Sequence, residues 1–142
     1  MRFEFVVQGD LPPKKDGASS MWSKQSEFAR LVALRRASLC ANPKPEVLRS
    51  RIHLLLEVHL LEPEARDSGD LDNFVSGVCD GLMKAASGLP DVNDWSDPSL
   101  ANVHPRHEIA IHDDAAVVEI VARKFAETGG PPWYRVVLEG EL

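Results

Sequence analysis

The sequence predicts a small α/β (α+β) domain in which two helices pack on one mixed sheet, in the order β-α-β-α-β-β. Three observations carry this prediction. Residues 2–8 and 51–60 alternate apolar with polar side chains, as half-buried strands do. Residues 24–41 and 71–86 repeat apolar side chains at helical spacing. A run rich in β-branched residues, 116–125, predicts a further strand near the C-terminus.

The first half of the chain is expected to form a strand, a loop, a helix and a second strand. Prolines and glycines predict the loop at 9–20, and Asn42-Pro43 ends the helix, on which Arg30 and Arg36 face outward. The buried stripe of this helix is expected to be Phe28, Leu31, Val32 and Leu39. The apolar face of the second strand is expected to hold Ile52, Leu54, Leu56, Val58 and Leu60, and its other face His53, Glu57 and His59.

The second half is expected to form a helix, a long loop and two strands. Residues 62–69 predict a polar turn before the helix. Residues 87–108 are rich in Pro, Asp and Asn, which predicts a loop with at most one helical turn. The last strand covers 133–138, and we expect it to pair with strand 116–125 as a hairpin. All 142 residues thus form one domain with an inserted loop at about 87–112.

Composition and charge bound the function. No apolar run approaches the roughly 20 residues that span a bilayer, and the N-terminus lacks a signal pattern. Cys40 and Cys79 lie in apolar helical contexts, which favours buried free thiols and a cytoplasmic location. The net charge is −6, but residues 1–51 carry +5 and residues 52–142 carry −11. The basic part is suited to a phosphate backbone, although charge alone favours a merely solvated helix face.

The carboxylates of the second helix are the main functional signal. Asp72 and Asp80 lie in line with Ser76 on the side opposite the apolar stripe, and Asp70 precedes the helix. Carboxylates this close repel one another unless a cation offsets their charge. Mg²⁺ suits such a site, because it binds through one or two carboxylates plus water and phosphate. The alternative is that Asp70 and Asp72 are ordinary acids of a helix N-terminus.

A second block follows near the end of the chain. Asp113-Asp114 precede a β-rich run, and Lys124 comes ten residues after Asp114. In a strand through 114–124 these two residues have the same parity and share a face. Together with residues 69–82, this block resembles the RusA-type Holliday-junction resolvases, and the likeness covers nearly the whole chain.

The resemblance implies a homodimeric, Mg²⁺-dependent endonuclease that resolves four-way DNA junctions by paired symmetric nicks in recombination and repair. It implies metal-binding carboxylates at Asp70, Asp72 and Asp114, with Lys124 at the phosphate. Asn73, Asp80 and Asp113 would support that site. The basic candidates for DNA contact are Lys14, Lys15, Arg30 and Arg36. A metal-activated water and a nearby lysine are what phosphodiester hydrolysis needs.

Three features depart from the family. Ser76 stands where the family has a lysine, for which Lys84 or Lys124 are candidate substitutes. The insertion at about 87–112 adds some twenty residues, including His104, His107 and His112, whose loop-like flanks favour solvated histidines over a zinc site. The third departure is the acidic net charge.

Two alternatives to a nuclease follow from these departures. A RusA-fold dimer that binds branched DNA, or another partner, without cutting it is the first. A metal-dependent hydrolase of small phosphate substrates is the second, and the chain lacks a glycine-rich nucleotide loop for it.

Overall fold

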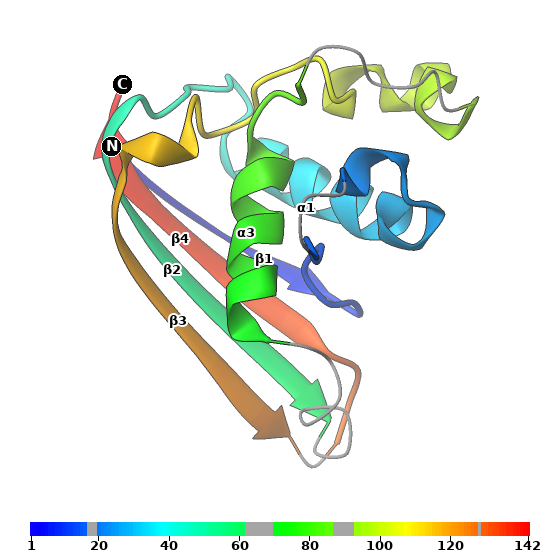
Figure 1. The fold of residues 1–142 in the computed structure, drawn as a ribbon, viewed down its shortest axis with the longest axis vertical. Helices are drawn as coiled ribbons and strands as arrows, with labels where there is room; N and C mark the ends of the chain where they lie inside the picture. The colour runs from blue at the N-terminus through cyan, green and yellow to red at the C-terminus, as the bar shows by residue number, and fades with distance from the viewer. Residues whose placement is uncertain (17–19, 62–69, 87–92, 128) are drawn as a thin grey trace.

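The computed structural model describes residues 1–16, 20–61, 70–86, 93–127 and 129–142. It has a mixed four-stranded sheet with helices on one face, which confirms the predicted fold class (Figure 1). The main elements are β1 (Arg2–Gln8), α1 (Gln25–Ala41), β2 (Ser50–Leu61), α3 (Leu71–Leu82), β3 (Val117–Glu127) and β4 (Trp133–Glu141). Short 3-10 turns are η1 (Met21–Ser23), η2 (Asn93–Ser96), η3 (Pro98–Val103) and η4 (Asp114–Ala116). The predicted turn at 62–69 lies outside the described residues.

The expected hairpin of the last two strands is wrong. The strand order is β1-β4-β2-β3, so β4 inserts between β1 and β2 and does not touch β3. β3 pairs parallel with β2, and β4 pairs antiparallel with both of its neighbours. Burial explains the order: Tyr134, Val136 and Leu138 of β4 are fully buried, whereas most of β3 is exposed. A helix between β2 and β3 also provides the crossover that parallel strands require.

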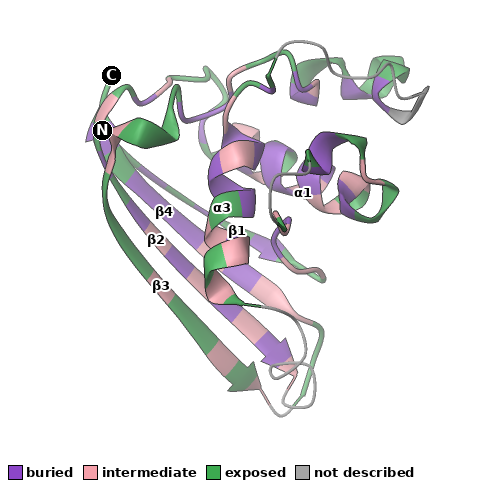
Figure 2. Cartoon of the chain, viewed as in Figure 1, coloured by how far each residue is buried: buried purple, intermediate pink, exposed green. Residues whose placement is uncertain are grey.

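The main core lies between the sheet and the two helices. The predicted apolar face of β2 is confirmed, because all five of its side chains are at most 2% exposed. Phe74, Val78 and Leu82 of α3 pack against this face, and each is fully buried. Figure 2 shows buried, intermediate and exposed residues alternating along α3, and Asp72 and Ser76 are among its exposed residues. The candidate carboxylates are therefore on the open side of a helix that the core holds in place.

The α1 helix buries different residues from those expected. Leu31 and Val32 are buried as predicted, but Phe28 and Leu39 are only half-buried. Leu34 and Arg35 are fully buried instead. A charged side chain inside a helix breaks the apolar periodicity, which is why the sequence pattern missed this face.

Arg35 joins α1 to the inserted segment and to the end of α3. Burial lowers the pKa of its guanidinium to about 9, which leaves it charged at neutral pH. Five backbone carbonyls accept its hydrogen bonds, and its guanidinium lies 5.1 Å from the Trp22 ring centroid. These carbonyls belong to Gly81, Met83, Val103, His104 and His107, at 2.6–3.1 Å. The insertion is thus anchored from inside the fold.

The described part of the inserted segment, residues 93–112, packs as a lobe where a long loop with at most one helical turn was expected. Its η2 and η3 turns bring Trp95, Leu100 and Val103 into a second apolar cluster with Trp22 of η1. The Trp95 ring nitrogen donates to the backbone oxygen of Trp22 at 3.2 Å. No helix among the described residues is long and apolar enough to cross a membrane.

Candidate active site

The N-terminal end of α3 carries two exposed carboxylates. Asp70 is the N-cap residue, but its side chain accepts no capping hydrogen bond, and Asp72 lies in the first turn. Among the described residues, no side chain or backbone group forms a hydrogen bond or ion pair with either carboxylate. Two open oxygen donors at a helix N-terminus have the chemistry that Mg²⁺ uses, so this pair fits the ion.

The C-terminal end of α3 carries a different pair, Asp80 and Asp114. The Lys15 ammonium lies 2.6 Å from Asp80 Oδ2. The backbone N–H of Asp114 donates to Met83 Sδ at 3.2 Å, which places η4 beside the end of α3. Burial, the charge of Asp114 and the charge of Asp80 raise the pKa of Cys79 to about 12. Asp114 therefore lies near Asp80 and not near Asp72.

The three predicted metal ligands do not meet within one chain. Asp72 and Met83 are eleven positions apart, which corresponds to about 17 Å along a helix. The described part of the chain contains no group of three or more His, Cys, Asp or Glu side chains able to hold a metal ion. Asp70 and Asp72 thus fit as a pair, whereas Asp114 of the same chain does not complete their site.

Asp113, Asp114 and Lys124 do not lie on one strand as expected. Asp113 Oδ1 accepts from the backbone N–H of Ala115 at 2.9 Å, which starts the η4 turn. Asp114 is inside this turn, and β3 begins only at Val117. Asp114 and Lys124 therefore do not share a face of one strand, as the predicted strand through 114–124 would have them do. Lys124 is in β3 opposite Val58, whose buried side chain faces the helices, so Lys124 projects from the helix side of the sheet.

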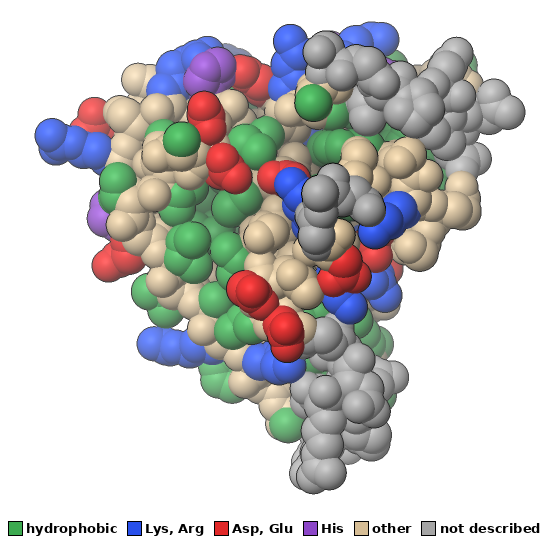
Figure 3. Space-filling model, in the orientation of Figure 1, with side chains coloured by type: hydrophobic (Ala, Val, Ile, Leu, Met, Phe, Trp, Pro, Cys, Tyr) green, Lys and Arg blue, Asp and Glu red, His purple; other side chains and the backbone are tan. Residues whose placement is uncertain are grey.

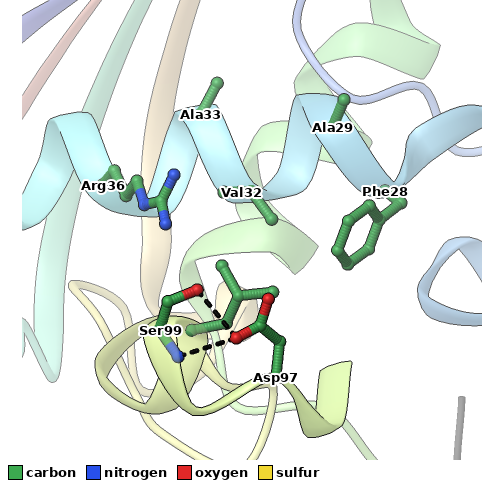
Figure 4. A pocket seen from close by; sticks show the side chains of 8 residues that line it. Phe28, Ala29, Val32, Ala33, Arg36, Asp97 and Ser99 are labelled. Carbon is green, nitrogen blue, oxygen red and sulfur yellow. Dashed lines mark hydrogen bonds between the residues drawn. The ribbon is translucent and has the colours of Figure 1, made fainter. Parts of the chain in front are cut away.

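Most of the predicted DNA-contacting cations are ion-paired inside the chain. Arg36 is exposed and borders two shallow grooves along α1, with volumes of about 590 and 680 Å³. In the first groove, Arg36 projects from α1 and Asp97 lies on the opposite wall beside Ser99 (Figure 4). The paired cations are Lys14 with Asp16 at 3.6 Å, Lys15 with Asp80, and Arg30 with Asp10 at 3.3 Å and Glu27 at 3.6 Å.

A strap of the N-terminal loop, residues 11–16, crosses the open side of α3. The backbone N–H of Lys15 donates to the Asn73 oxygen at 3.1 Å, and Asn73 Nδ2 donates to Asp16 Oδ1 at 2.9 Å. A Cβ on Gly77 would lie 1.9 Å from the carbonyl oxygen of Pro13. Only glycine at position 77 therefore admits the strap. Sequence reasoning missed this contact, although Pro12-Pro13 and Gly77 were its visible signals.

Apolar surface separates the two ends of α3 on its β3 side. Val118 and Ile120 of β3 are 63% and 51% exposed, and β3 is an edge strand of the sheet. Figure 3 shows apolar side chains gathered on this face, with acidic side chains above and below them.

The two cysteines differ in burial, and the histidines of the insertion take part in hydrogen bonds within the fold. Cys79 is buried as predicted, but Cys40 is exposed because it lies on the outer side of α1. The backbone oxygens of His104 and His107 accept hydrogen bonds from Arg35, and His112 Nδ1 pairs with Glu108.

No protein-family model matches the chain, and no curated protein matches its sequence.

Proposed function

We propose that this chain is a Mg²⁺-dependent, structure-selective DNA endonuclease that resolves four-way junctions by paired nicks. The observation that carries the proposal is the exposed Asp70–Asp72 pair. Its carboxylates neither cap the helix nor pair with a cation among the described residues. The RusA-like order of the two Asp blocks supports this assignment. A helix-stabilising role alone would leave the missing side-chain cap of Asp70 unexplained.

The residues divide the chemistry between them. Asp70 and Asp72 would hold Mg²⁺, which supplies an activated water and offsets charge at the phosphate when bound. Lys124 projects on the same side of the sheet as the helices, where its ammonium can contact a phosphate oxygen. Asn73 holds the strap through its backbone oxygen and its side chain, and so supports the site from its own position on α3.

A second copy of the chain would bring the separated carboxylates together. In a two-fold pair with antiparallel α3 helices, the N-terminal end of one helix lies opposite the C-terminal end of the other. The partner's Asp114 then approaches Asp70 and Asp72. Such pairing would also cover the exposed Val118 and Ile120 of β3. The proposed enzyme is therefore a homodimer in which each site takes residues from both copies.

Cleavage of a synthetic four-way junction tests the activity. We expect paired symmetric nicks with Mg²⁺, none with EDTA, and little cutting of a linear duplex of the same sequence. A folded protein that cuts neither substrate at any Mg²⁺ concentration would overturn the proposal.

Mixing two inactive variants tests the shared site. Asp72→Asn and Asp114→Asn would each abolish cleavage, but a mixed dimer would contain one site with both native carboxylates. We expect single-strand nicking to return when the two variants are unfolded together and refolded as a mixture. If each chain holds a complete site, the mixture stays as inactive as the separate variants.

A binding protein without cleavage is the second candidate. Position 76 is exposed and carries a serine where the family has a lysine, which favours this alternative. Junction binding that is unaffected by Asp72→Asn, combined with no cleavage in the native chain or in Ser76→Lys, would support it.

A further inference from the structure

Position 76 is where the resemblance expects a lysine and where this chain has a serine. Ser76 is exposed on the open side of α3, one helical turn from both Asp72 and Asp80. The two substitutes suggested by the sequence lie elsewhere. Lys84 is exposed beyond the last residue of α3, and Lys124 belongs to β3.

The strap brings another lysine to this side of α3. Its backbone touches the helix at Gly77, the residue next to Ser76, and Lys15 is the second residue after Pro13. The hydrogen bond from the Lys15 N–H to the Asn73 oxygen fixes the strap along the helix. The position of Lys15 is therefore set by backbone contacts, which do not depend on its own side chain.

The Lys15 side chain points along α3 toward the next turn. Its ammonium lies 2.6 Å from Asp80 Oδ2, and Asp80 is one turn beyond Ser76. A third of the Lys15 side chain is exposed, at 33%, whereas that of Asp80 is 19% exposed. The ammonium is thus held in place by a less exposed carboxylate, on a side chain that keeps a third of its surface open to solvent.

The geometry points to Lys15 as the lysine that replaces the one missing at position 76. Resting on the proposed nuclease function and on its antiparallel pairing of two chains, we assign the Lys15 ammonium to the scissile phosphate held at Asp70 and Asp72 of the partner subunit, because that pairing places the C-terminal end of one α3 opposite the N-terminal end of the other. Hydrolysis bonds a water oxygen to phosphorus and breaks the bond between phosphorus and the sugar oxygen. One proton of the water goes to the released sugar hydroxyl, and the other stays on the new phosphate monoester or passes to solvent. The Lys15 ammonium offsets the negative charge that collects on the nonbridging oxygens and keeps its own protons. Asp80 is a positioning residue that orients it.

Moving the charge back to position 76 tests this assignment. We would compare the native chain with Lys15→Ala, with Lys15→Ala/Ser76→Lys, and with a control, Lys44→Ala, which removes an exposed lysine from a loop. Single-turnover junction cleavage with Mg²⁺ should fall by roughly 10²–10³-fold in Lys15→Ala. The double variant should recover at least tenfold over Lys15→Ala, and the control should match the native chain.

A binding measurement without cleavage separates a phosphate contact from a structural role. Junction affinity is measured in EDTA over a range of salt concentrations, and the melting temperature of each variant is recorded. Lys15→Ala should lower the slope of log affinity against log salt by about one, and loss of its ion pair with Asp80 should lower the melting temperature by only a few degrees, so the protein stays folded in the assay. Lys15→Gln serves as a second variant if the alanine chain does not fold.

The outcomes distinguish this inference from the proposed function. Loss in Lys15→Ala with recovery in the double variant supports it. A native chain that cuts junctions while Lys15→Ala and Lys15→Gln cut equally well overturns the role of Lys15 and leaves the nuclease intact. Loss in Lys15→Ala that Ser76→Lys does not restore, with an unchanged salt slope, also overturns it. A native chain that does not cut overturns both.

Discussion

The two ends of α3 carry the same residue type in opposite electrostatic surroundings. Asp70 and Asp72 lie at the N-terminal end, where the helix dipole favours negative charge, and no cation among the described residues pairs with them. Asp80 lies at the C-terminal end, where the dipole disfavours negative charge, and Lys15 pairs with it. Arg35 donates to the Gly81 and Met83 oxygens at the same end.

This difference shows that the position of a carboxylate along a helix decides whether the helix dipole stabilises its charge or a neighbouring cation must do so. At the N-terminal end the helix itself stabilises the acids, so they can remain open to a metal ion. At the C-terminal end an acid requires a neighbouring cation, and the fold supplies Lys15 from a distant loop. The open pair is suited to bind a ligand, and the paired end is suited to hold a lysine in place.

Removal of one open carboxylate should have the largest effect. Asp72→Asn should reduce junction cleavage by roughly 10²–10³-fold or more, because a ligand of the proposed ion is lost. Its stability should fall by only about 0.3–1 kcal/mol, the contribution of an acid to a helix N-terminus. Single-turnover cleavage and thermal unfolding measure the two effects, with Glu46→Gln in an exposed loop as the control. Full activity in Asp72→Asn would remove the metal site from this end of α3.

Removal of the buried Arg35 guanidinium should destabilise the C-terminal end of α3 and the insertion. Arg35→Met leaves five carbonyls of α3 and the insertion without their donor. We expect a loss of about 3 kcal/mol in the free energy of unfolding and a melting temperature about 10 °C lower. Arg36→Met is the matched control, because its side chain is exposed on the same helix. Equal melting temperatures for the two variants would show that Arg35 does not anchor the insertion.

Displacement of the strap should cost less stability than removal of the Arg35 guanidinium. Gly77→Ala places a methyl group against the backbone of Pro13, and we expect a loss of about 1–3 kcal/mol. The control is Gly81→Ala, whose Cβ would lie 2.6 Å from the tip of the Leu34 side chain. A flexible side chain can rotate away and a backbone cannot, so Gly77→Ala should lose more stability in urea unfolding. The reverse order would contradict the contact between the strap and α3.

The reactivity of the two thiols should show the smallest effect. Burial, followed by the charges of Asp114 and Asp80, raises the pKa of Cys79 to about 12, which leaves about one molecule in ten thousand as thiolate at pH 8. Cys40 is exposed, so a thiol reagent should titrate one cysteine in the native protein and two in guanidinium. Cys40→Ser should show none until unfolding. Rapid reaction of two thiols in the native chain would mean that this end of α3 is open to solvent.

Elements with regular alternation of apolar and polar residues could be predicted from the sequence. Elements whose place depends on contacts between distant segments could not. The apolar face of β2 followed from its alternation, because each alternate side chain of a strand lies on one face. The hairpin prediction for β3 and β4 failed, because adjacency in the chain does not determine which strand is apolar enough to be central. The α1 face failed at Arg35, whose burial depends on carbonyls from residues 46 to 72 positions away.

By itself the sequence determined the α+β class, the alternating strands and the presence of two aspartate blocks. Those properties depend on local periodicity and residue type, which can be read directly from the sequence. Only the tertiary structure decided that the two blocks lie at opposite ends of α3, that the insertion packs around Arg35, and that Lys15 reaches Asp80. Each of these is a contact between segments distant in sequence, and its energy comes from burial and charge pairing that no local pattern records.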